Sequence, residues 1–100
     1  MKVMISQPMR GKTNEQIREE RKELIKKLEL EGHEVIDTVI AEEPPKNIDE
    51  AIYYLSKSIE FIANADAIVF MPGWEEARGC KIEYCVAKEY GKFVRELWLV

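Results

Sequence analysis

Short apolar runs alternate along this chain with longer stretches in which apolar residues recur every three or four positions. The short runs predict four strands, at residues 2–7, 34–39, 67–71 and from 93 onward, with 97–100 as an extension of the last. The periodic stretches predict three helices, from residue 13 to a stop at Gly32, from 47 to about 64, and from about 77 to a stop at Gly91. Strands and helices therefore alternate along the whole chain.

Capping residues mark where two of these helices begin. Thr13 has the position and chemistry of an N-cap, and Gln16 follows three residues later as its capping-box partner. Asn47 and Glu50 repeat this pattern at the start of the second helix. Residues 41–47 contain two consecutive prolines and are expected to form a surface loop before that helix.

The first two helices each carry an apolar stripe that is predicted to face the core. Arg21 falls on the stripe of the first helix, which it can join only by its aliphatic stem, with its charged head in water. The other members of that stripe are Ile17, Leu24, Ile25 and Leu28. The stripe of the second helix is predicted to be Ile48, Ile52, Leu55, Ile59 and Ile62.

Alternating strands and helices favour a parallel sheet with helices on both faces. We expect one domain over residues 1–100 with a flavodoxin-like three-layer α/β sandwich and a four-stranded sheet in the order 2-1-3-4. This order places the switch in winding direction between the first and third strands. Ligands of such folds bind outside the carboxyl ends of the strands at that point, so a small-molecule site is expected there.

Composition excludes several classes of protein. A net charge of −4 argues against a nucleic-acid binder, which needs a basic face. The chain has no apolar stretch long enough for a membrane span, and its N-terminal apolar run is too short for a signal peptide. Cys80 and Cys85 have the wrong spacing for a zinc site and are expected to be reduced thiols in a cytoplasmic protein. No motif calls for a metal or another cofactor.

The loop after the first strand contains a possible anion site. Arg10 and Gly11 combine a cation, a turn and the amino end of the following helix, although an ordinary surface ion pair would explain Arg10 equally well. Gly11, Lys12 and Thr13 resemble the end of a phosphate-binding P-loop, but Ser6 stands where that motif needs a glycine. The P-loop interpretation is therefore disfavoured.

Glu83 is the candidate nucleophile. Its neighbours on the third helix are apolar, aromatic or small, and the amino end of the helix favours the ionised carboxylate that a nucleophile needs. The alternative is an ordinary glutamate near the start of a helix. Trp74, in the loop after the third strand, could stack on a nucleobase or sugar, cover an edge of the core or form a subunit contact.

Three segments of the chain resemble a known family. Residues 5–11, 65–74 and 77–83 are similar to DUF4406, a family of bacteria and phages that looks like a branch of the nucleoside 2-deoxyribosyltransferase superfamily. The resemblance covers essentially the whole chain. It implies a flavodoxin-like fold, cleavage of an N-glycosidic bond in a nucleoside or nucleotide, and a homodimer or larger assembly whose subunits complete the site.

The same resemblance assigns roles to individual positions. Glu83 matches the nucleophile of the superfamily. Gly73 and Gly79 match a turn that helps to hold sugar or phosphate. The residues that match the ligand-binding loop of the first strand are Ser6, Pro8, Met9, Arg10 and Gly11. Arg10 and Glu83 are accordingly expected to converge on one cavity, with Trp74 as a wall of the base pocket.

Two positions depart from the superfamily pattern. Ser58 stands where an aspartate usually lies eight residues before the Ala-Asp of the third strand, and Met4 replaces a tyrosine of some members. Ser58 is kept as a binding residue, but it cannot act as an acid or base at neutral pH. Either Asp37, Glu75 or Glu76 takes the role of the missing carboxylate, or catalysis is weak or lost.

Three functions follow from these positions. The first is an enzyme in which Glu83 displaces the base and forms a covalent glycosyl-enzyme. The second is a nucleotide-binding module with the same pocket and little or no catalysis. The third is an assembly protein in which Trp74 and Trp98 anchor an interface.

Overall fold

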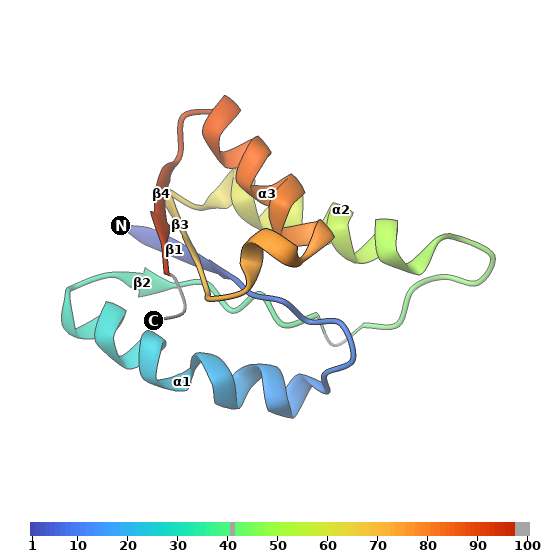
Figure 1. Cartoon of the computed structure of the whole chain (residues 1–100), viewed down its shortest axis with the longest axis horizontal. Coiled ribbons are helices and arrows are strands. Elements are labelled where there is room, and N and C mark those ends of the chain that lie inside the picture. Colours follow the sequence, from blue (N-terminus) through green and yellow to red (C-terminus); the bar gives the residue numbers. More distant parts are fainter. Residues whose placement is uncertain (41, 98–100) are drawn as a thin grey trace.

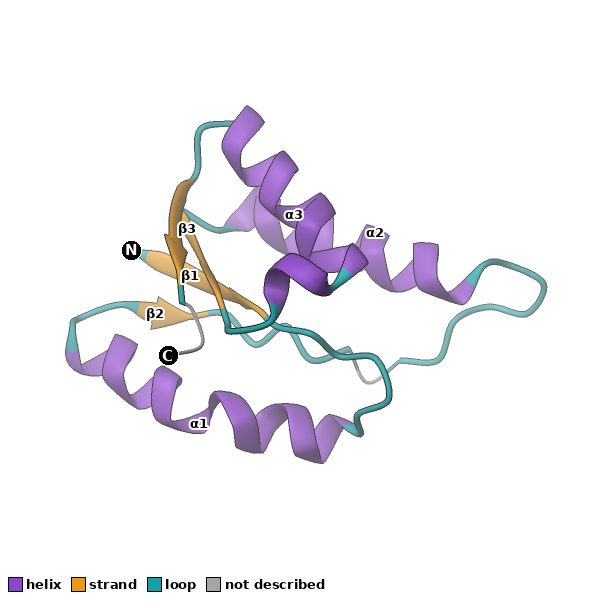
Figure 2. Ribbon diagram, in the orientation of Figure 1, coloured by secondary structure: helices purple, strands orange, loops and turns teal. Residues whose placement is uncertain are grey.

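The computed structural model describes residues 1–40 and 42–97 and consists of one parallel sheet with helices on both faces (Figure 1). The strands lie in the order β2-β1-β3-β4. In chain order the elements are β1 (Lys2–Ser6), α1 (Asn14–Leu30), β2 (Glu34–Val35), α2 (Glu50–Asn64), β3 (Ala67–Phe70), a single 3₁₀ turn η1 (Trp74–Glu76), α3 (Arg78–Glu89) and β4 (Phe93–Glu96) (Figure 2). The flavodoxin-like sandwich and its predicted strand order are confirmed.

Alternate residues of the central strands face different helical layers, which gives the molecule two apolar clusters. The sheet residues Met4, Ile68 and Phe70 pack with Ile62 of α2 and Ala87 of α3. The sheet residues Val3, Ile5, Ala67 and Val69 pack with Leu28 of α1. Helices α2 and α3 therefore cover one face of the sheet, and α1 covers the other (Figure 1).

The ends of α1 agree with the prediction. Thr13 Oγ1 accepts a hydrogen bond from the Gln16 backbone N–H at 3.1 Å, and the Gln16 side chain accepts one from the Thr13 N–H at 2.8 Å. This capping box satisfies two backbone donors that would otherwise have no partner within the helix. Gly32 has a φ of 90°, the left-handed conformation in which glycine commonly follows the end of a helix.

The second strand is much shorter than predicted. Only Glu34–Val35 forms β2, in register with β1, and one further hydrogen bond joins the Ile36 N–H to the Val3 carbonyl at 2.9 Å. The Asp37 carboxylate then accepts a hydrogen bond from the Val39 N–H at 3.0 Å. This local contact competes with sheet pairing and turns the chain away from β1.

The start of the second helix was predicted two residues too early. Asp49, rather than Asn47, caps α2, and its carboxylate accepts a hydrogen bond from the Ile52 N–H at 3.1 Å. Asn47 adopts a left-handed φ of 66°, which is incompatible with the extended backbone of an N-cap. The predicted extension of the fourth strand over residues 98–100, with Trp98, lies outside the described residues.

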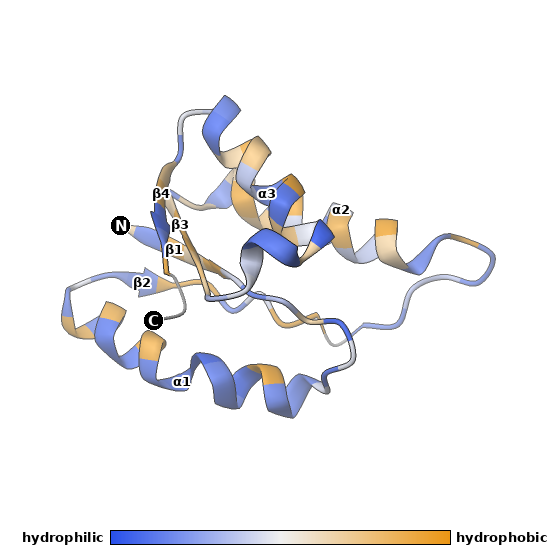
Figure 3. Cartoon of the chain, viewed as in Figure 1, coloured by the Kyte–Doolittle hydropathy of each residue, from blue (hydrophilic) through white to orange (hydrophobic). Residues whose placement is uncertain are grey.

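The predicted buried stripe of α2 is largely wrong. Ile62 is the only residue of the helix that is fully buried, and Leu55 is partly buried. Ile48, Ile52 and Ile59 are exposed, with 64% of the Ile52 surface accessible to solvent. Figure 3 shows apolar segments along α2, whereas α1 is hydrophilic over most of its length. Part of the apolar surface of α2 is therefore exposed to solvent rather than packed against the core.

None of the helices in the described part of the chain is long and apolar enough to cross a membrane.

Candidate functional site

The loops that follow β1 and β3 meet at the carboxyl edge of the sheet. Ser6 and Phe70 are paired at the ends of these strands, and the Met71 N–H donates a hydrogen bond to the Ser6 carbonyl at 2.9 Å. Gly73 has a φ of 91°, and a Cβ at this position would lie 3.6 Å from Cγ of Pro8. The two loops therefore come together at the switch point, as the strand order predicted.

Glu83 reaches this edge from the second turn of α3. The Ser6 hydroxyl donates a hydrogen bond of 2.6 Å to Oε2 of Glu83. The Ser58 hydroxyl, from α2, is also hydrogen-bonded to this carboxylate. Glu83 is only 8% exposed, so β1, α2 and α3 together enclose it. The glutamate is not the solvated helix residue that was the alternative interpretation.

Burial raises the pKa of the Glu83 carboxyl above its ordinary value of 4.5. Hydrogen bonds from the two hydroxyls and the positive charge of Arg21 lower this pKa, but they do not outweigh the loss of solvent. Burial also raises the pKa of the neighbouring Cys80 thiol, to about 11, although a hydrogen bond with Ser6 opposes the shift. Cys80 is therefore a neutral thiol at physiological pH, which makes it a poor nucleophile.

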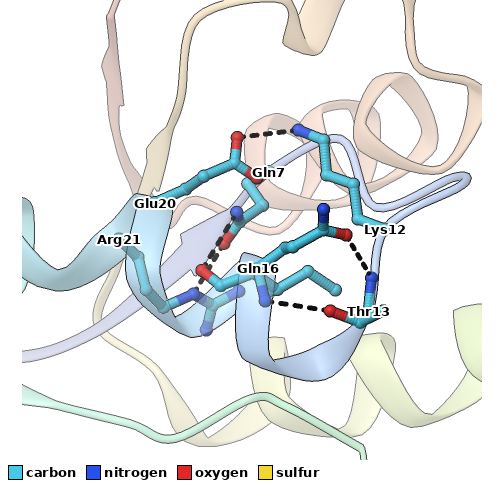
Figure 4. Close-up of polar contacts among 7 residues, drawn as sticks. Gln7, Lys12, Thr13, Gln16, Glu20 and Arg21 are labelled. Atoms are coloured by element: carbon cyan, nitrogen blue, oxygen red, sulfur yellow. Dashed lines mark hydrogen bonds and ion pairs between the residues drawn. The ribbon is translucent and has the colours of Figure 1, made fainter.

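Arg21 corrects an expectation from the sequence, because its charged head is buried rather than in water. The residue is only 3% exposed. Its Nε donates a hydrogen bond of 2.6 Å to Oε1 of Gln7, and its Nη1 donates one of 2.8 Å to the Thr38 hydroxyl. Gln7 in turn donates to the Ile17 carbonyl at 3.3 Å (Figure 4). The network ties α1 to the ends of β1 and β2.

The loop cation Arg10 is not part of this buried cluster. It is exposed, as are its neighbours Met9 and Gly11, while Pro8 is partly buried against Gly73. Two hollows of about 220 and 260 Å³ lie in the surface, and neither is lined by Arg10 or Glu83. Their geometry gives no support to the cavity that these two residues were expected to share.

A model of the family DUF4406, described as a domain of unknown function, matches residues 1–96. The chain belongs to the DUF4406 family. No curated protein and no solved structure matches it.

In this DUF4406 protein Trp74 covers an edge of the core, which was one of the alternatives drawn from the sequence. It is 7% exposed and stacks on Tyr84, with ring centroids 4.7 Å apart and an interplanar angle of 15°. Its ring also packs against Phe70 at 5.4 Å. The indole is therefore held inside the domain, and nothing in this packing supports its expected place in the wall of a base pocket.

The carboxylates considered as substitutes for the missing aspartate are exposed, whereas Glu83 is buried. Glu75 and Glu76 are exposed in η1, and Asp37 is exposed near the end of β2. Partial burial raises the pKa of Asp37, but hydrogen bonds from the Val39 N–H and from Arg18 more than offset this and leave the pKa lowered. A carboxylate that holds its proton so weakly is a poor general acid at neutral pH.

The other predicted glycine of the site, Gly79, lies in the first turn of α3, where added side-chain atoms would meet no neighbour.

Within the described residues, no three histidine, cysteine, aspartate or glutamate side chains are grouped so that they could hold a metal ion. The buried polar residue that the sequence analysis misplaced is Arg21. Its position on an otherwise apolar stripe was the available signal, because a stripe position is a buried position.

Proposed function

We propose that this protein cleaves the N-glycosidic bond of nucleosides or nucleoside 5′-monophosphates, with Glu83 as the nucleophile. The observation that carries the proposal is a buried carboxylate held by Ser6 and Ser58 at the carboxyl edge of the sheet. A surface glutamate needs no such arrangement, because water satisfies its oxygens. The resemblance to nucleoside 2-deoxyribosyltransferases supplies the type of reaction.

The proposed reaction has two steps. An oxygen of Glu83 forms a bond to the anomeric carbon, while the bond from that carbon to the base nitrogen breaks and its electron pair leaves with the base. The base takes a proton from solvent or from a group not identified among the described residues. Water or a second base then attacks the same carbon and releases Glu83. Arg10, exposed in the loop after β1, would bind a phosphate or hydroxyl of the substrate.

A second candidate is a nucleotide-binding module of the same fold with little or no catalysis. Ser58 favours it, since a hydroxyl at this position cannot supply the acid–base chemistry of an aspartate. The raised pKa of Glu83 also favours it, because a protonated carboxyl is not a nucleophile.

Incubation with a panel of deoxynucleosides, ribonucleosides and their 5′-monophosphates separates these two functions. Free base detected by chromatography, from at least one compound, supports the enzyme. Thermal stabilisation by a compound that is not cleaved supports the binding module. If no compound is cleaved and none stabilises the fold, both functions are wrong, and a role in assembly becomes the better proposal.

The pH dependence of base release should follow the ionisation of Glu83. Because burial raises its pKa, the acidic limb of kcat/KM should lie above pH 4.5, the ordinary pKa of a glutamate. Activity should increase about tenfold per pH unit below that limb, since only the carboxylate attacks. Initial rates measured from pH 4 to 9 provide the test. An acidic limb at or below pH 4.5 would contradict the assignment of Glu83 as the ionising group.

We also propose that two copies of the chain associate through the exposed apolar face of α2. Ile52 and Ile59 are exposed on this helix, Ile48 is exposed just before it, and Ile82 is exposed on the neighbouring α3. Ile52→Asp should convert a dimer into a monomer in sedimentation-velocity experiments, because it would bury a charge in the interface. Leu30→Asp is the matched control, since Leu30 is 89% exposed on α1. A wild type that is monomeric at about 100 μM would exclude the proposed dimer, whose affinity should be micromolar or tighter.

The proposed compartment is the cytoplasm. Cys80 and Cys85 are both free in the structure, the first buried and the second exposed. An exposed free thiol is typical of a reducing environment.

A further inference from the structure

Arg21 is a buried cation whose hydrogen-bond partners are neutral. Its two hydrogen bonds go to the Gln7 amide and the Thr38 hydroxyl. Its Nη2 is buried and has no hydrogen-bond partner among the residues that the structure describes. Buried charges are normally balanced by an opposite charge, because their transfer from water is otherwise very unfavourable. Two carboxylate charges act on Arg21 from a distance: that of Asp37, which has the larger effect, and that of Glu83.

Two consecutive residues bring Arg21 and Glu83 toward the same point. Ser6 donates its hydroxyl to Glu83, which reaches the sheet from α3. Gln7, the next residue, accepts a hydrogen bond from Arg21, which reaches the sheet from α1. Successive side chains of an extended chain point to opposite faces. The cation and the carboxylate thus approach the end of β1 from opposite sides of the sheet, and water is largely excluded from both.

We propose that Arg21 is the counter-charge of Glu83 and favours the ionised form of the buried carboxylate from across the end of β1. Arg21 is then a positioning residue, because it acts through Glu83 rather than on the substrate. The effect of Arg21 on catalysis rests on the function proposed above, whereas the pairing of the two charges does not. Gln7 and Thr38 fix the guanidinium, so that its charge stays at this point of the sheet.

The other groups around Glu83 do not replace this charge. Ser6 from β1 and Ser58 from α2 are neutral donors, and Cys80 from α3 holds a neutral thiol. Lys12, in the loop after β1, is engaged in an ion pair of 2.9 Å with Glu20 on α1. Asp37 raises the pKa of Arg21 more than Glu83 does, but it is exposed and pairs with Arg18 at 3.3 Å.

Carbon and nitrogen NMR on the ligand-free full chain tests the pairing without any substrate. The Arg21 Nε–H signal should shift with pH, with the same midpoint as the side-chain carboxyl carbon of Glu83. In Glu83→Gln this shift should disappear, since the amide keeps the shape of the side chain but has no charge to titrate. An Arg21 signal that does not change as Glu83 titrates, or that titrates unchanged in Glu83→Gln, would overturn the proposal. This test does not depend on whether any variant of Arg21 folds.

Two matched variants distinguish the effect of the Arg21 charge from the effect of the hydrogen bonds that hold the side chain. Arg21→Met keeps most of the side-chain volume and removes the charge, so the pKa of Glu83 should rise further. Thr38→Val removes one hydrogen bond of the network and keeps the charge, so that pKa should stay at its wild-type value. Equal pKa values of Glu83 in wild type and Arg21→Met, or equal shifts in both variants, would assign Arg21 a purely structural role.

The same pair of variants has a kinetic readout if the wild type releases base. Arg21→Met should move the acidic limb of kcat/KM to higher pH and recover activity above it, whereas Thr38→Val should leave the limb in place. Absence of base release would remove the proposed function but leave the NMR result to decide the pairing.

Discussion

Glu83→Gln should reduce the release of free base by about 10³-fold or more, the loss typical of removing a catalytic nucleophile. An amide cannot form the glycosyl ester, but it has nearly the same shape as the carboxylate and can still accept the 2.6 Å hydrogen bond from Ser6. The measurement is the rate of base formation at neutral pH by chromatography. More than about a tenth of wild-type activity in this variant would exclude Glu83 as the nucleophile.

The same variant should fold at least as well as the wild type. The folded protein holds the Glu83 proton more tightly than the unfolded chain, because burial raises the pKa of this carboxyl. Glu83 therefore lowers the free energy of unfolding as the pH rises from its ordinary 4.5 through its raised pKa. At pH 7 we expect Glu83→Gln to be more stable by about 1 kcal/mol, a gain typical of relieving a strained functional site.

This gain in stability should vanish in acid. Well below pH 4.5 the carboxyl is neutral in the folded and the unfolded state alike, so the two proteins should unfold at similar temperatures. Glu76→Gln, on the exposed η1 turn, is the control for removing one negative charge and should change neither activity nor stability. A Glu83→Gln protein that is less stable than wild type at pH 7 would argue for a structural role of the carboxylate.

Arg21→Ala should be the most destabilising of the single substitutions considered for this chain, with a loss of about 3 kcal/mol in the free energy of unfolding. The change removes the packing of a buried side chain and leaves Gln7 and Thr38 without the partner that they share. For a domain of this size, the melting temperature should fall by roughly 12–24 °C. Urea denaturation followed by circular dichroism measures the free energy directly.

Arg18 provides the matched control on the same helix. It also carries a guanidinium, but it is exposed and pairs with Asp37 at the surface, at 3.3 Å. Arg18→Ala should cost no more than about 0.5 kcal/mol, because solvent screens such pairs. If the two alanine variants are equally stable, the buried network around Arg21 does not contribute to the fold in the way its geometry indicates.

Much of the fold could be predicted because local chemistry and apolar periodicity agree. Thr13 and Gln16 form the predicted capping box at the start of α1, and the alternation of elements was enough to choose the strand order. The convergence of the two loops followed from that order, since the carboxyl ends of adjacent parallel strands share one edge. Glu83 could be singled out because its helical neighbours are not charged.

The errors arose where tertiary contacts decide between two locally equivalent states. An arginine on an apolar stripe can extend into water or turn inward, and only the partners Gln7 and Thr38, from two other elements, make the second possible for Arg21. An apolar helix face serves equally well for a core or for an interface, which is why Ile52 and Ile59 were misassigned. A sequence pattern shows neither the hydrogen-bond partners of a buried arginine nor whether an apolar helix face packs on the core.

The consecutive residues Ser6 and Gln7 also determine how this protein tolerates changes in length. A deletion of a single residue within β1 would shift the strand by one position and exchange the faces to which its side chains point. Ser6 would then turn toward α1 and Gln7 toward α3, so both buried networks would be lost together. The connection over residues 42–49 projects from the body of the molecule and has no comparable constraint (Figure 2). Natural insertions and deletions among relatives should therefore accumulate in that connection and be rare in the first strand.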